Sequence, residues 1–389
     1  MKFIDLAEQQ KRIRDKIEDR LRAVLDHGQY VNGPEIDTLE SQLAAYTGTR
    51  HAVACSSGTD ALLMGLMAMN IGPGDAVITT PFTFAATVEV IALLGAVPVF
   101  VDIDPVTFNI NPALIENTVV SLIDGKDRGC PIPRRLLQNR PKLRGIIAVD
   151  LFGLPADYSS IDQIAAKYGL FVIDDAAQSF GAEYLGKKSC SFGDLGCTSF
   201  FPAKPLGAYG DGGMCFTDDD LLAETIRSIR NHGQGSDKYE NVRIGINGRL
   251  DTMQAAILLA KMEVFPEELG LRDQRAQTYR TLLYSAGSPV VCPTVPKGYL
   301  SAWAQYSVLA KEGIDRSALM GTLGSAGIPT AIYYPKPLHL QTAFKDLGYR
   351  EGDFPVSERC AQRIFSPPMH PYLKYEDQQR IADILLAAR

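Results

Sequence analysis

The sequence contains no apolar run that approaches the roughly 20 residues a membrane-spanning helix needs. Its first residues, MKFIDLAEQQKRIRDKI, become charged too early to supply the apolar core of a signal peptide. Neither membrane insertion nor secretion is predicted, and we expect a cytoplasmic protein with no membrane partner.

Clustered positive charge and paired cysteines are also scarce. The formal net charge is −6 and no long basic tract occurs. Nucleic acid is therefore not an expected partner, because phosphate neutralisation needs clustered Lys and Arg. The seven cysteines are scattered and form no C-x-x-C pair, so neither a zinc site nor a redox dithiol is indicated. We expect no bound metal.

The length of 389 residues favours two domains over one core. We place them at residues 1–265 and 266–389. An α/β pattern fills the first range, and a smaller α+β pattern fills most of the second. From about Leu250 a long helix is predicted to carry the chain out of the first domain, with a bend at Pro266.

Short β-rich runs alternate with helical stretches in the first domain. This alternation predicts an α/β fold with a mostly parallel, seven-stranded mixed sheet between helices. The predicted strands are His51–Cys55, Ala76–Thr79, Val97–Val101, Gly145–Val149, Leu170–Ile173, Cys197–Phe201 and Gly213–Thr217, the last two with possible antiparallel pairing.

Two charged residues stand where such a fold carries chemistry. Asp175 ends an apolar strand, and ligands of open α/β sheets bind beyond the carboxyl ends of strands. Lys204 lies alone among apolar and small residues between Pro202 and Pro205, surroundings that lower the pKa of an amine as a Schiff base requires. The alternatives are a solvated acidic turn and a snorkelling surface lysine.

A third motif, Cys55-Ser-Ser-Gly-Thr-Asp-Ala61, lies between a strand and a helix, where backbone N–H groups can bind an anion near Gly58. Such turns are common, so this motif alone is weak. A strand-end acid, an enclosed lysine and a phosphate cradle are together the parts that pyridoxal phosphate (PLP) needs. Phe84 is a candidate for stacking on the cofactor, with a plain core role as the alternative.

The chain resembles the DegT/DnrJ/EryC1/StrS family of PLP-dependent sugar aminotransferases, which have PLP fold type I. The resemblance covers nearly the whole chain. It rests on SSGTDAL, PFTFAAT, VIDDAAQSFGA, TSFFPAKPLGAYGDGG and NGRLDTMQAA, which occur in that order.

The resemblance implies a role for each matching residue. Lys204 would bind the cofactor covalently and Asp175 would pair with its ring nitrogen. Gln178 would lie near the phenolic oxygen, and Phe84 would stack on the ring. The phosphate would contact Gly58, Thr59 and Ser199, together with Asn247 from the partner of a homodimer with shared active sites. The alternative for Asn247 is a turn residue.

Within this family the chain resembles enzymes that act on 3-keto UDP-sugars, including a 3-keto hexuronic acid. By this resemblance Arg249 would bind the sugar, and Tyr333, Tyr334 and His339 are further substrate-binding candidates. Tyr333-Tyr334-Pro335 departs from the "HYP" of the uronate enzymes, which puts the uronate in doubt. A structural role for His339 is the alternative.

The segment 124–144 is longer than its family counterpart. Its basic side chains include those of Arg134, Arg135, Arg140, Lys142 and Arg144. We interpret it as a solvated surface loop, with contact to a nucleotide diphosphate as the alternative.

The predicted activity is a ping-pong transfer of an amino group to a 3-keto UDP- or dTDP-sugar from an amino acid, by family analogy L-glutamate. A 4-keto sugar substrate is the nearest alternative. A sugar dehydratase is disfavoured because that branch replaces the lysine by histidine, whereas Lys204 is present. A non-catalytic regulatory protein on the same fold is the alternative from another class.

Overall fold

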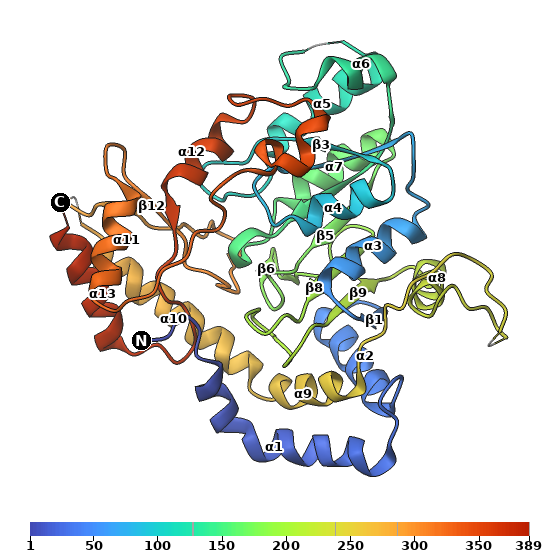
Figure 1. Cartoon of the computed structure of the whole chain (residues 1–389), viewed down its shortest axis with the longest axis horizontal. Helices are drawn as coiled ribbons and strands as arrows, with labels where there is room; N and C mark the ends of the chain where they lie inside the picture. The colour runs from blue at the N-terminus through green and yellow to red at the C-terminus, as the bar shows by residue number, and fades with distance from the viewer. Residues whose placement is uncertain (127, 238, 286, 389) are drawn as a thin grey trace.

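A seven-stranded sheet forms the centre of the computed structural model, which describes residues 1–126, 128–237, 239–285 and 287–388, without the side chain of Arg135 (Figure 1). The strand order is β1-β9-β8-β5-β4-β2-β3. The strands are β1 (His51–Cys55), β2 (Asp75–Thr79), β3 (Val97–Phe100), β4 (Lys142–Val149), β5 (Phe171–Asp175), β8 (Leu195–Ser199) and β9 (Gly213–Thr217). β9 runs antiparallel to β1 and β8, and the other neighbouring pairs are parallel. The prediction of a mostly parallel, seven-stranded mixed sheet is confirmed.

Successive side chains of each strand pack against helices on opposite faces of the sheet, as the strand period of two requires. On one face, Val77, Ile147 and Ile173 join a core with α3 (Gly58–Ala68), α4 (Ala86–Leu93) and α8 (Asp220–Arg230). On the other face, the helices are α5 (Pro112–Asp124), α6 (Arg134–Asn139) and α7 (Tyr158–Tyr168) over β2 to β5, and α2 (Pro34–Thr47) and α9 (Thr252–Met262) over β1 and β9. Both faces are therefore covered, and the ends of the strands are left for a binding site.

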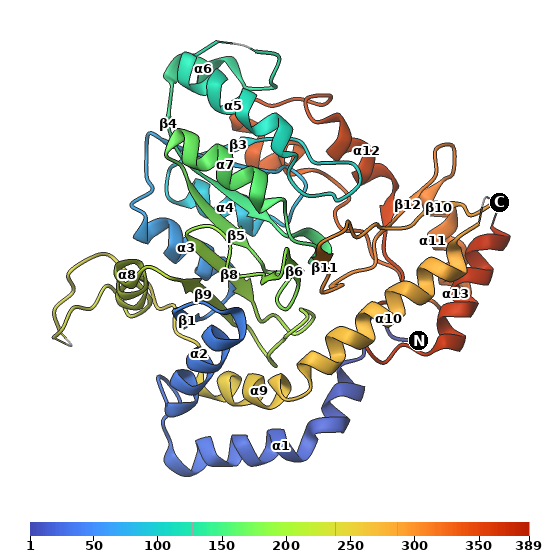
Figure 2. The same ribbon diagram turned by 180° about the vertical axis from the view of Figure 1, so that it is seen from behind.

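The long helix expected from Leu250 is divided into α9 and α10 (Phe265–Leu283), with Pro266 in the first turn of α10. The expected bend is confirmed, because proline is tolerated in a first turn and not inside a helix. α1 (Leu6–His27) lies along α9, and Ile13 and Ile17 pack against Ile257. Figure 2 shows α10 running from α9 towards the C-terminal helix α13 (Tyr375–Ala387).

The C-terminal part combines α10, α13 and α11 (Arg316–Ser325) with a small sheet around a core of its own. The remaining elements are α12 (Pro355–Arg363), β6 (Glu183–Tyr184), β7 (Lys187–Lys188), β10 (Val290–Val291), β11 (Tyr299–Leu300), β12 (Val308–Ala310), β13 (Ile364–Phe365), and the 3-10 helices η1 (Leu151–Gly153), η2 (Leu338–Leu340) and η3 (Thr342–Leu347). β11 pairs with β6, and Cys360 and Ile364 share a core with Phe82, so the two parts are packed together. The division at residues 265 and 266 stays a prediction.

Within the described part of the chain, no helix is both long and apolar enough to cross a bilayer.

Candidate active site

The candidate site lies where β4, β5 and β8 end, at the carboxyl edge of the parallel strands. β5 ends with Asp175 and β8 ends with Ser199. The chain after β4 turns back onto the same edge, where the backbone N–H of Asp150 donates to the carbonyl oxygen of Asp175 at 3.1 Å. Three neighbouring strands thus bring together residues that are far apart in sequence.

Asp175 is buried, with 4% of its surface exposed, and its carboxylate accepts two hydrogen bonds. The hydroxyl of Thr87 on α4 donates to Oδ2 at 2.7 Å, and the backbone N–H of Ala177 donates to Oδ1 at 3.3 Å. Burial raises the pKa of Asp175, whereas the Thr87 hydrogen bond and the positive charge of Lys204 lower it. Thr87 was not singled out from the sequence, although it is the last residue of the PFTFAAT motif.

Lys204 lies in the loop between β8 and β9, half-buried beside Asp175. Burial lowers the pKa of the Lys204 amine to about 8, and the charge of Asp175 opposes this shift. Within the described residues, Nζ of Lys204 makes no hydrogen bond or ion pair with protein. An amine without a partner and with a lowered pKa is suited to forming a covalent bond with a carbonyl group.

The predicted anion cradle is formed at the start of α3. Ser57 caps the helix, because its Oγ accepts a hydrogen bond of 3.0 Å from the backbone N–H of Asp60. A Cβ atom on Gly58 would lie 2.6 Å from Cβ of Ser199, so the close packing of the helix start on the end of β8 requires glycine there. Thr59 follows in the first turn and is half-buried. The positive end of the helix dipole and the Ser199 hydroxyl are thus brought together.

Aromatic side chains from two distant segments meet at this edge. The ring of Phe84 is exposed by 57%, and its centroid lies 6.3 Å from that of Tyr334. The side chain of Gln178 links this pair to η1, which follows β4, because its Nε2 donates to the Tyr334 hydroxyl at 3.3 Å and its Oε1 accepts from the backbone N–H of Phe152 at 2.9 Å. Tyr334 therefore brings the C-terminal part of the chain to this edge of the sheet.

Three further candidates stay predictions. The ring of Tyr333 is half-buried, with its centroid 6.0 Å from that of Tyr334. Asn247 is exposed and Arg249 is half-buried, and neither side chain makes a hydrogen bond or ion pair within the described residues. The backbone between them runs beside the anion cradle, because the carbonyl of Gly248 accepts a hydrogen bond of 2.9 Å from the N–H of Ser56.

His339 lies apart from these residues. Its side chain is buried, with Nε2 3.0 Å from a carboxylate oxygen of Glu358 and the ring centroid 4.7 Å from that of Phe354. Burial lowers the pKa of His339, against the effect of Glu358. The structure supports the structural role and does not bring His339 to the candidate site.

The basic segment 124–144 lies at the opposite edge of the sheet from Asp175. Arg144, near the start of β4, donates to Asp75 Oδ2 at 3.0 Å at the start of β2, and Arg140 donates to the carbonyl oxygen of Asp124 at 3.0 Å. The side chain of Arg135 lies outside the described residues. Because the parallel strands begin here, contact of this segment with a ligand at Lys204 is not supported.

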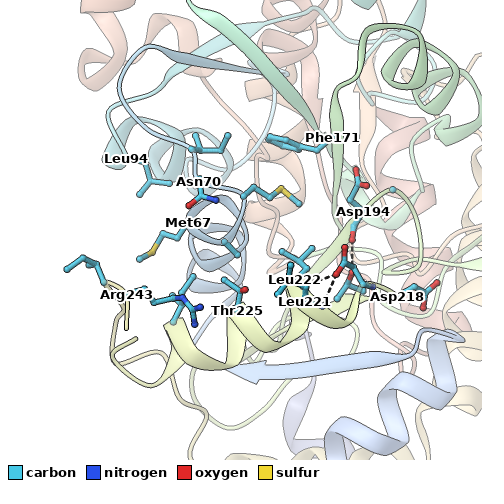
Figure 3. Close-up of a pocket in the computed structure, with 18 of the residues that line it drawn as sticks. Met67, Asn70, Leu94, Phe171, Asp194, Asp218, Leu221, Leu222, Thr225 and Arg243 are labelled. Atoms are coloured by element: carbon cyan, nitrogen blue, oxygen red, sulfur yellow. Dashed lines mark hydrogen bonds between the residues drawn. The ribbon is translucent and has the colours of Figure 1, made fainter. Parts of the chain in front are cut away.

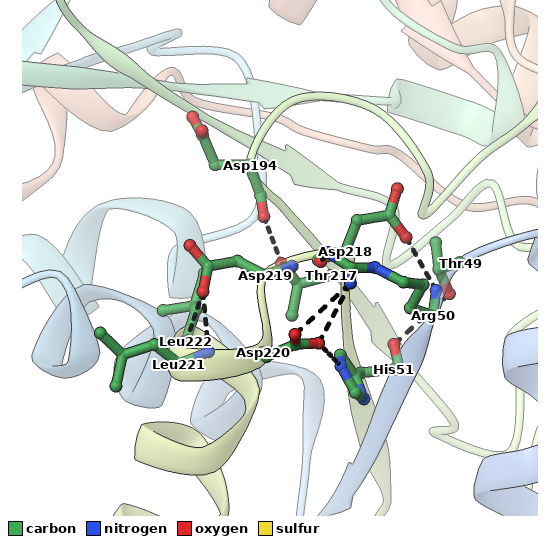
Figure 4. A network of polar contacts seen from close by, with 10 residues as sticks. All are labelled: Thr49, Arg50, His51, Asp194, Thr217, Asp218, Asp219, Asp220, Leu221 and Leu222. Atoms are coloured by element: carbon green, nitrogen blue, oxygen red, sulfur yellow. Dashed lines mark hydrogen bonds and ion pairs between the residues drawn. The ribbon is translucent and has the colours of Figure 1, made fainter.

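A hollow of about 1210 Å³ is also found at this amino edge, between the end of α3 and the start of α8 (Figure 3). It is lined by Met67, Leu94 and Phe171, among others. The acidic residues beside it already have partners (Figure 4). Asp219 caps α8, and Asp220 Oδ1 lies 2.7 Å from Nε2 of His51. None of the residues predicted for the active site lines the hollow, and the chemistry lies at the other edge.

Comparisons with known proteins agree with this geometry. A family model described as the DegT/DnrJ/EryC1/StrS aminotransferase family matches residues 11–386. The UDP-2-acetamido-2-deoxy-3-oxo-D-glucuronate aminotransferase of Pseudomonas aeruginosa is 46% identical, over 96% of each chain. The pleiotropic regulatory protein of Geobacillus stearothermophilus is 43% identical, over 98% of this chain and 96% of its own.

Solved structures share the fold. The DegT DnrJ EryC1 StrS aminotransferase from Brucella abortus has a TM-score of 0.92 at 47% identity and covers 99% of this chain and 98% of its own. The ntda protein from Bacillus subtilis with bound cofactor PMP has a TM-score of 0.85 at 30% identity and covers 99% of this chain and 83% of its own.

Proposed function

The chain belongs to the DegT/DnrJ/EryC1/StrS aminotransferase family, and from this premise we propose that it transfers an amino group from an amino acid to the keto carbon of a nucleotide-linked sugar. The observation that carries the proposal is the position of Lys204, whose amine makes no hydrogen bond or ion pair within the described residues, close to the buried Asp175 at one sheet edge. The family is PLP-dependent, and these residues fit that cofactor.

The fit rests on three features of the site. Nζ of Lys204 is free to bond to the cofactor aldehyde, and Asp175 offers a buried carboxylate to the ring nitrogen. The start of α3 at Gly58 offers backbone N–H groups to a phosphate, with the Ser199 hydroxyl beside them. Phe84 provides an exposed ring for stacking. Bound PLP supplies an electron sink for charge developing at the reacting carbon.

The side chains of the site divide the remaining work. Lys204 Nζ, with its pKa lowered to about 8, is a base of suitable strength to remove and return the proton at Cα of the amino-acid donor. The carboxylate of Asp175 lies close to this amine and would accept a hydrogen bond from the protonated ring nitrogen of the cofactor. The hydrogen bond from Thr87 fixes the orientation of the carboxylate. Gln178 and Tyr334, hydrogen-bonded to each other beside Phe84, would line one side of the bound cofactor.

The substrate we propose is a 3-keto UDP- or dTDP-sugar, with L-glutamate as the donor. Two curated relatives, the P. aeruginosa enzyme and one from Acidithiobacillus ferrooxidans at 38% identity, are named for 3-oxo or 3-dehydro UDP-sugars. Arg249, half-buried beside the anion cradle, is the proposed contact to the sugar, and Tyr333 and Tyr334 are the proposed aromatic contacts.

We also propose a cytoplasmic homodimer with shared active sites. Asn247 is exposed on a backbone that runs beside the anion cradle, a position that suits contact with a second copy. Exposed apolar side chains on the adjoining loop, including Val242 at 52% and Ile244 at 85%, support burial by a partner.

The test is the absorption spectrum of the PLP-loaded protein before and after addition of L-glutamate, followed by a keto-sugar nucleotide. We expect glutamate to bleach the band of the Lys204-bound cofactor and the keto-sugar to restore it. Lys204→Ala should lack both the band and turnover, and the exposed Lys11→Ala should retain both. An intact band that no amino donor bleaches would favour a regulatory protein on this fold, a role suggested by the name of the G. stearothermophilus relative.

A further inference from the structure

Directly behind Asp175 lies a polar cluster to which the proposed reaction assigns no role. It consists of Asp150, Asp174 and Tyr158, with 0%, 0% and 1% of their surfaces exposed. Asp174 is the first acid of the VIDDAAQ motif and its side chain faces away from that of Asp175, as neighbours on a strand do. In the described residues, no Lys, Arg or His pairs with either carboxyl group of the cluster.

The hydroxyl of Tyr158 touches both carboxyl groups. Its oxygen lies 2.8 Å from Oδ1 of Asp150 and 2.7 Å from Oδ1 of Asp174. A phenol carries one proton and can donate only one hydrogen bond. Two bare carboxylates would therefore leave one of these short contacts between lone pairs, in a place where water cannot intervene. One of the two carboxyl groups must carry a proton and donate it to the Tyr158 oxygen.

The other partners of the two carboxyl groups decide which one is protonated. Asp150 is also within reach of three donors, the N–H of Ala156 at 2.8 Å and the hydroxyls of Ser179 at 2.7 Å and Ser189 at 3.1 Å. Asp174 has one further donor, the backbone N–H of Cys190 at 2.7 Å. Because hydrogen bonds to a carboxylate stabilise its charged form, Asp150 is the better site for the charge.

We propose that Asp174 is a neutral carboxylic acid at neutral pH, donating its proton to the hydroxyl of Tyr158, and that the ionised Asp150 anchors the turn which presents Asp175 and Gln178. The anchoring follows from the contacts. Asp150 accepts from Ser179, the neighbour of Gln178, and its own backbone N–H donates to the carbonyl of Asp175.

The titratable groups that face the cluster agree with this assignment. Burial raises the pKa of Asp174, and the negative charge of Asp150 raises it further. Burial also raises the pKa of Tyr158 and of the Cys190 thiol, so both stay neutral. Tyr299, across the cluster, has its pKa raised by burial as well. Asp175 adds a further negative charge close to Asp174. Burial and the negative charges of Asp150 and Asp175 favour the protonated form of Asp174, whereas the contacts with the Tyr158 hydroxyl and the backbone N–H of Cys190 oppose it more weakly than burial does.

The proton assignment is independent of the proposed function, whereas the positioning role rests on it. The first experiment is the infrared spectrum of the PLP-loaded protein at neutral pH. We expect a band of a protonated, water-shielded carboxyl group, which disappears in Asp174→Asn and persists in the exposed control Asp26→Asn. Absence of such a band from the wild-type protein, or its persistence in Asp174→Asn, would overturn the assignment. In Tyr158→Phe the band should shift or vanish because its acceptor is lost, and an unchanged band would also count against it.

The second experiment measures the dissociation constant of PLP and the absorption of the bound cofactor. An amide at 174 reproduces the donor of a neutral acid, so Asp174→Asn should bind PLP within about twofold of the wild type. An amide at 150 removes the anion and meets three donors, so Asp150→Asn should weaken binding about tenfold or more and shift the absorption. Equal effects of the two variants would refute the positioning role. Failure of the protein to transaminate, with these results intact, would count only against the proposed function.

Discussion

Nζ of Lys261 donates a hydrogen bond of 2.6 Å to the carbonyl oxygen of Gly207, three residues beyond Lys204. Lys261 lies on α9 with 1% of its surface exposed, and its ammonium group lies 4.2 Å from the centroid of the Tyr209 ring. A second lysine with a lowered pKa, about 8, thus supports the loop that carries the reactive one.

Replacing Lys261 by Met should loosen this loop without changing any residue that touches the cofactor. Loss of a buried, charge-assisted hydrogen bond is expected to lower the free energy of unfolding by about 1–3 kcal/mol. The PLP dissociation constant should rise in parallel. Urea unfolding and PLP titration check this, with the exposed Lys11→Met as the control. Equal stability and PLP affinity of the two variants would contradict the supporting role.

Replacing Thr87 by Val should raise the pKa of Asp175, because the 2.7 Å hydrogen bond to its charged form is removed. A net hydrogen-bond contribution of about 0.5–1.5 kcal/mol corresponds to a shift of up to about one pKa unit. The acid limb of the pH dependence of cofactor absorption should move to higher pH by this amount. Thr83→Val is the matched control, because Thr83 contacts the hydroxyl of Thr87 at 3.1 Å and not Asp175.

Replacing Gly58 by Ala should impair phosphate binding, because the added Cβ meets Cβ of Ser199 at 2.6 Å. We expect PLP affinity to fall at least about tenfold as the helix start and the strand end are pushed apart. Removing the Ser199 side chain relieves the contact. The double variant Gly58→Ala/Ser199→Gly should therefore bind PLP more tightly than additivity predicts. Strict additivity in PLP titrations would show that the two positions are not in contact.

The proton on Asp174 predicts a pH dependence of stability with a definite sign. The pKa of Asp174 is raised in the folded state, whereas in the unfolded chain an aspartate titrates near about 4. Between these values the folded state binds more protons, so its stability falls as pH rises. Above about pH 4 the wild-type protein should lose up to about 1.4 kcal/mol per pH unit relative to Asp174→Asn, until Asp174 ionises. Unfolding free energies of both proteins from pH 4 to 8 measure this difference, and parallel curves would contradict it.

The strands and the two charged groups of the site could be predicted from local sequence. β1 and β9 have the predicted bounds, because β-rich apolar runs end there at polar or glycine residues. Asp175 and Lys204 were placed by the strand-end rule and by the unusual surroundings of one lysine. These are properties of a short stretch of chain, which sequence reasoning handles well.

Contacts between distant segments could not be predicted in the same way. Gln178 and Tyr334 are 156 positions apart, and only the packing of the C-terminal part onto the sheet brings them together. His339 has the polarity of a ligand, yet Glu358 and Phe354 from a later segment enclose it. The proton shared by Asp174 and Tyr158 likewise depends on two distances that no sequence pattern encodes.

Because the candidate site draws on α3, β5, the β8–β9 loop and the segment around Tyr334, it exists only when the whole chain is folded. A cofactor that binds there binds the native state and not the unfolded chain, so it displaces the folding equilibrium by mass action. The thermal midpoint should accordingly climb with free PLP concentration. In a cell, the supply of the vitamin-derived cofactor would then help set how much of this protein survives, and not only how much of it is active.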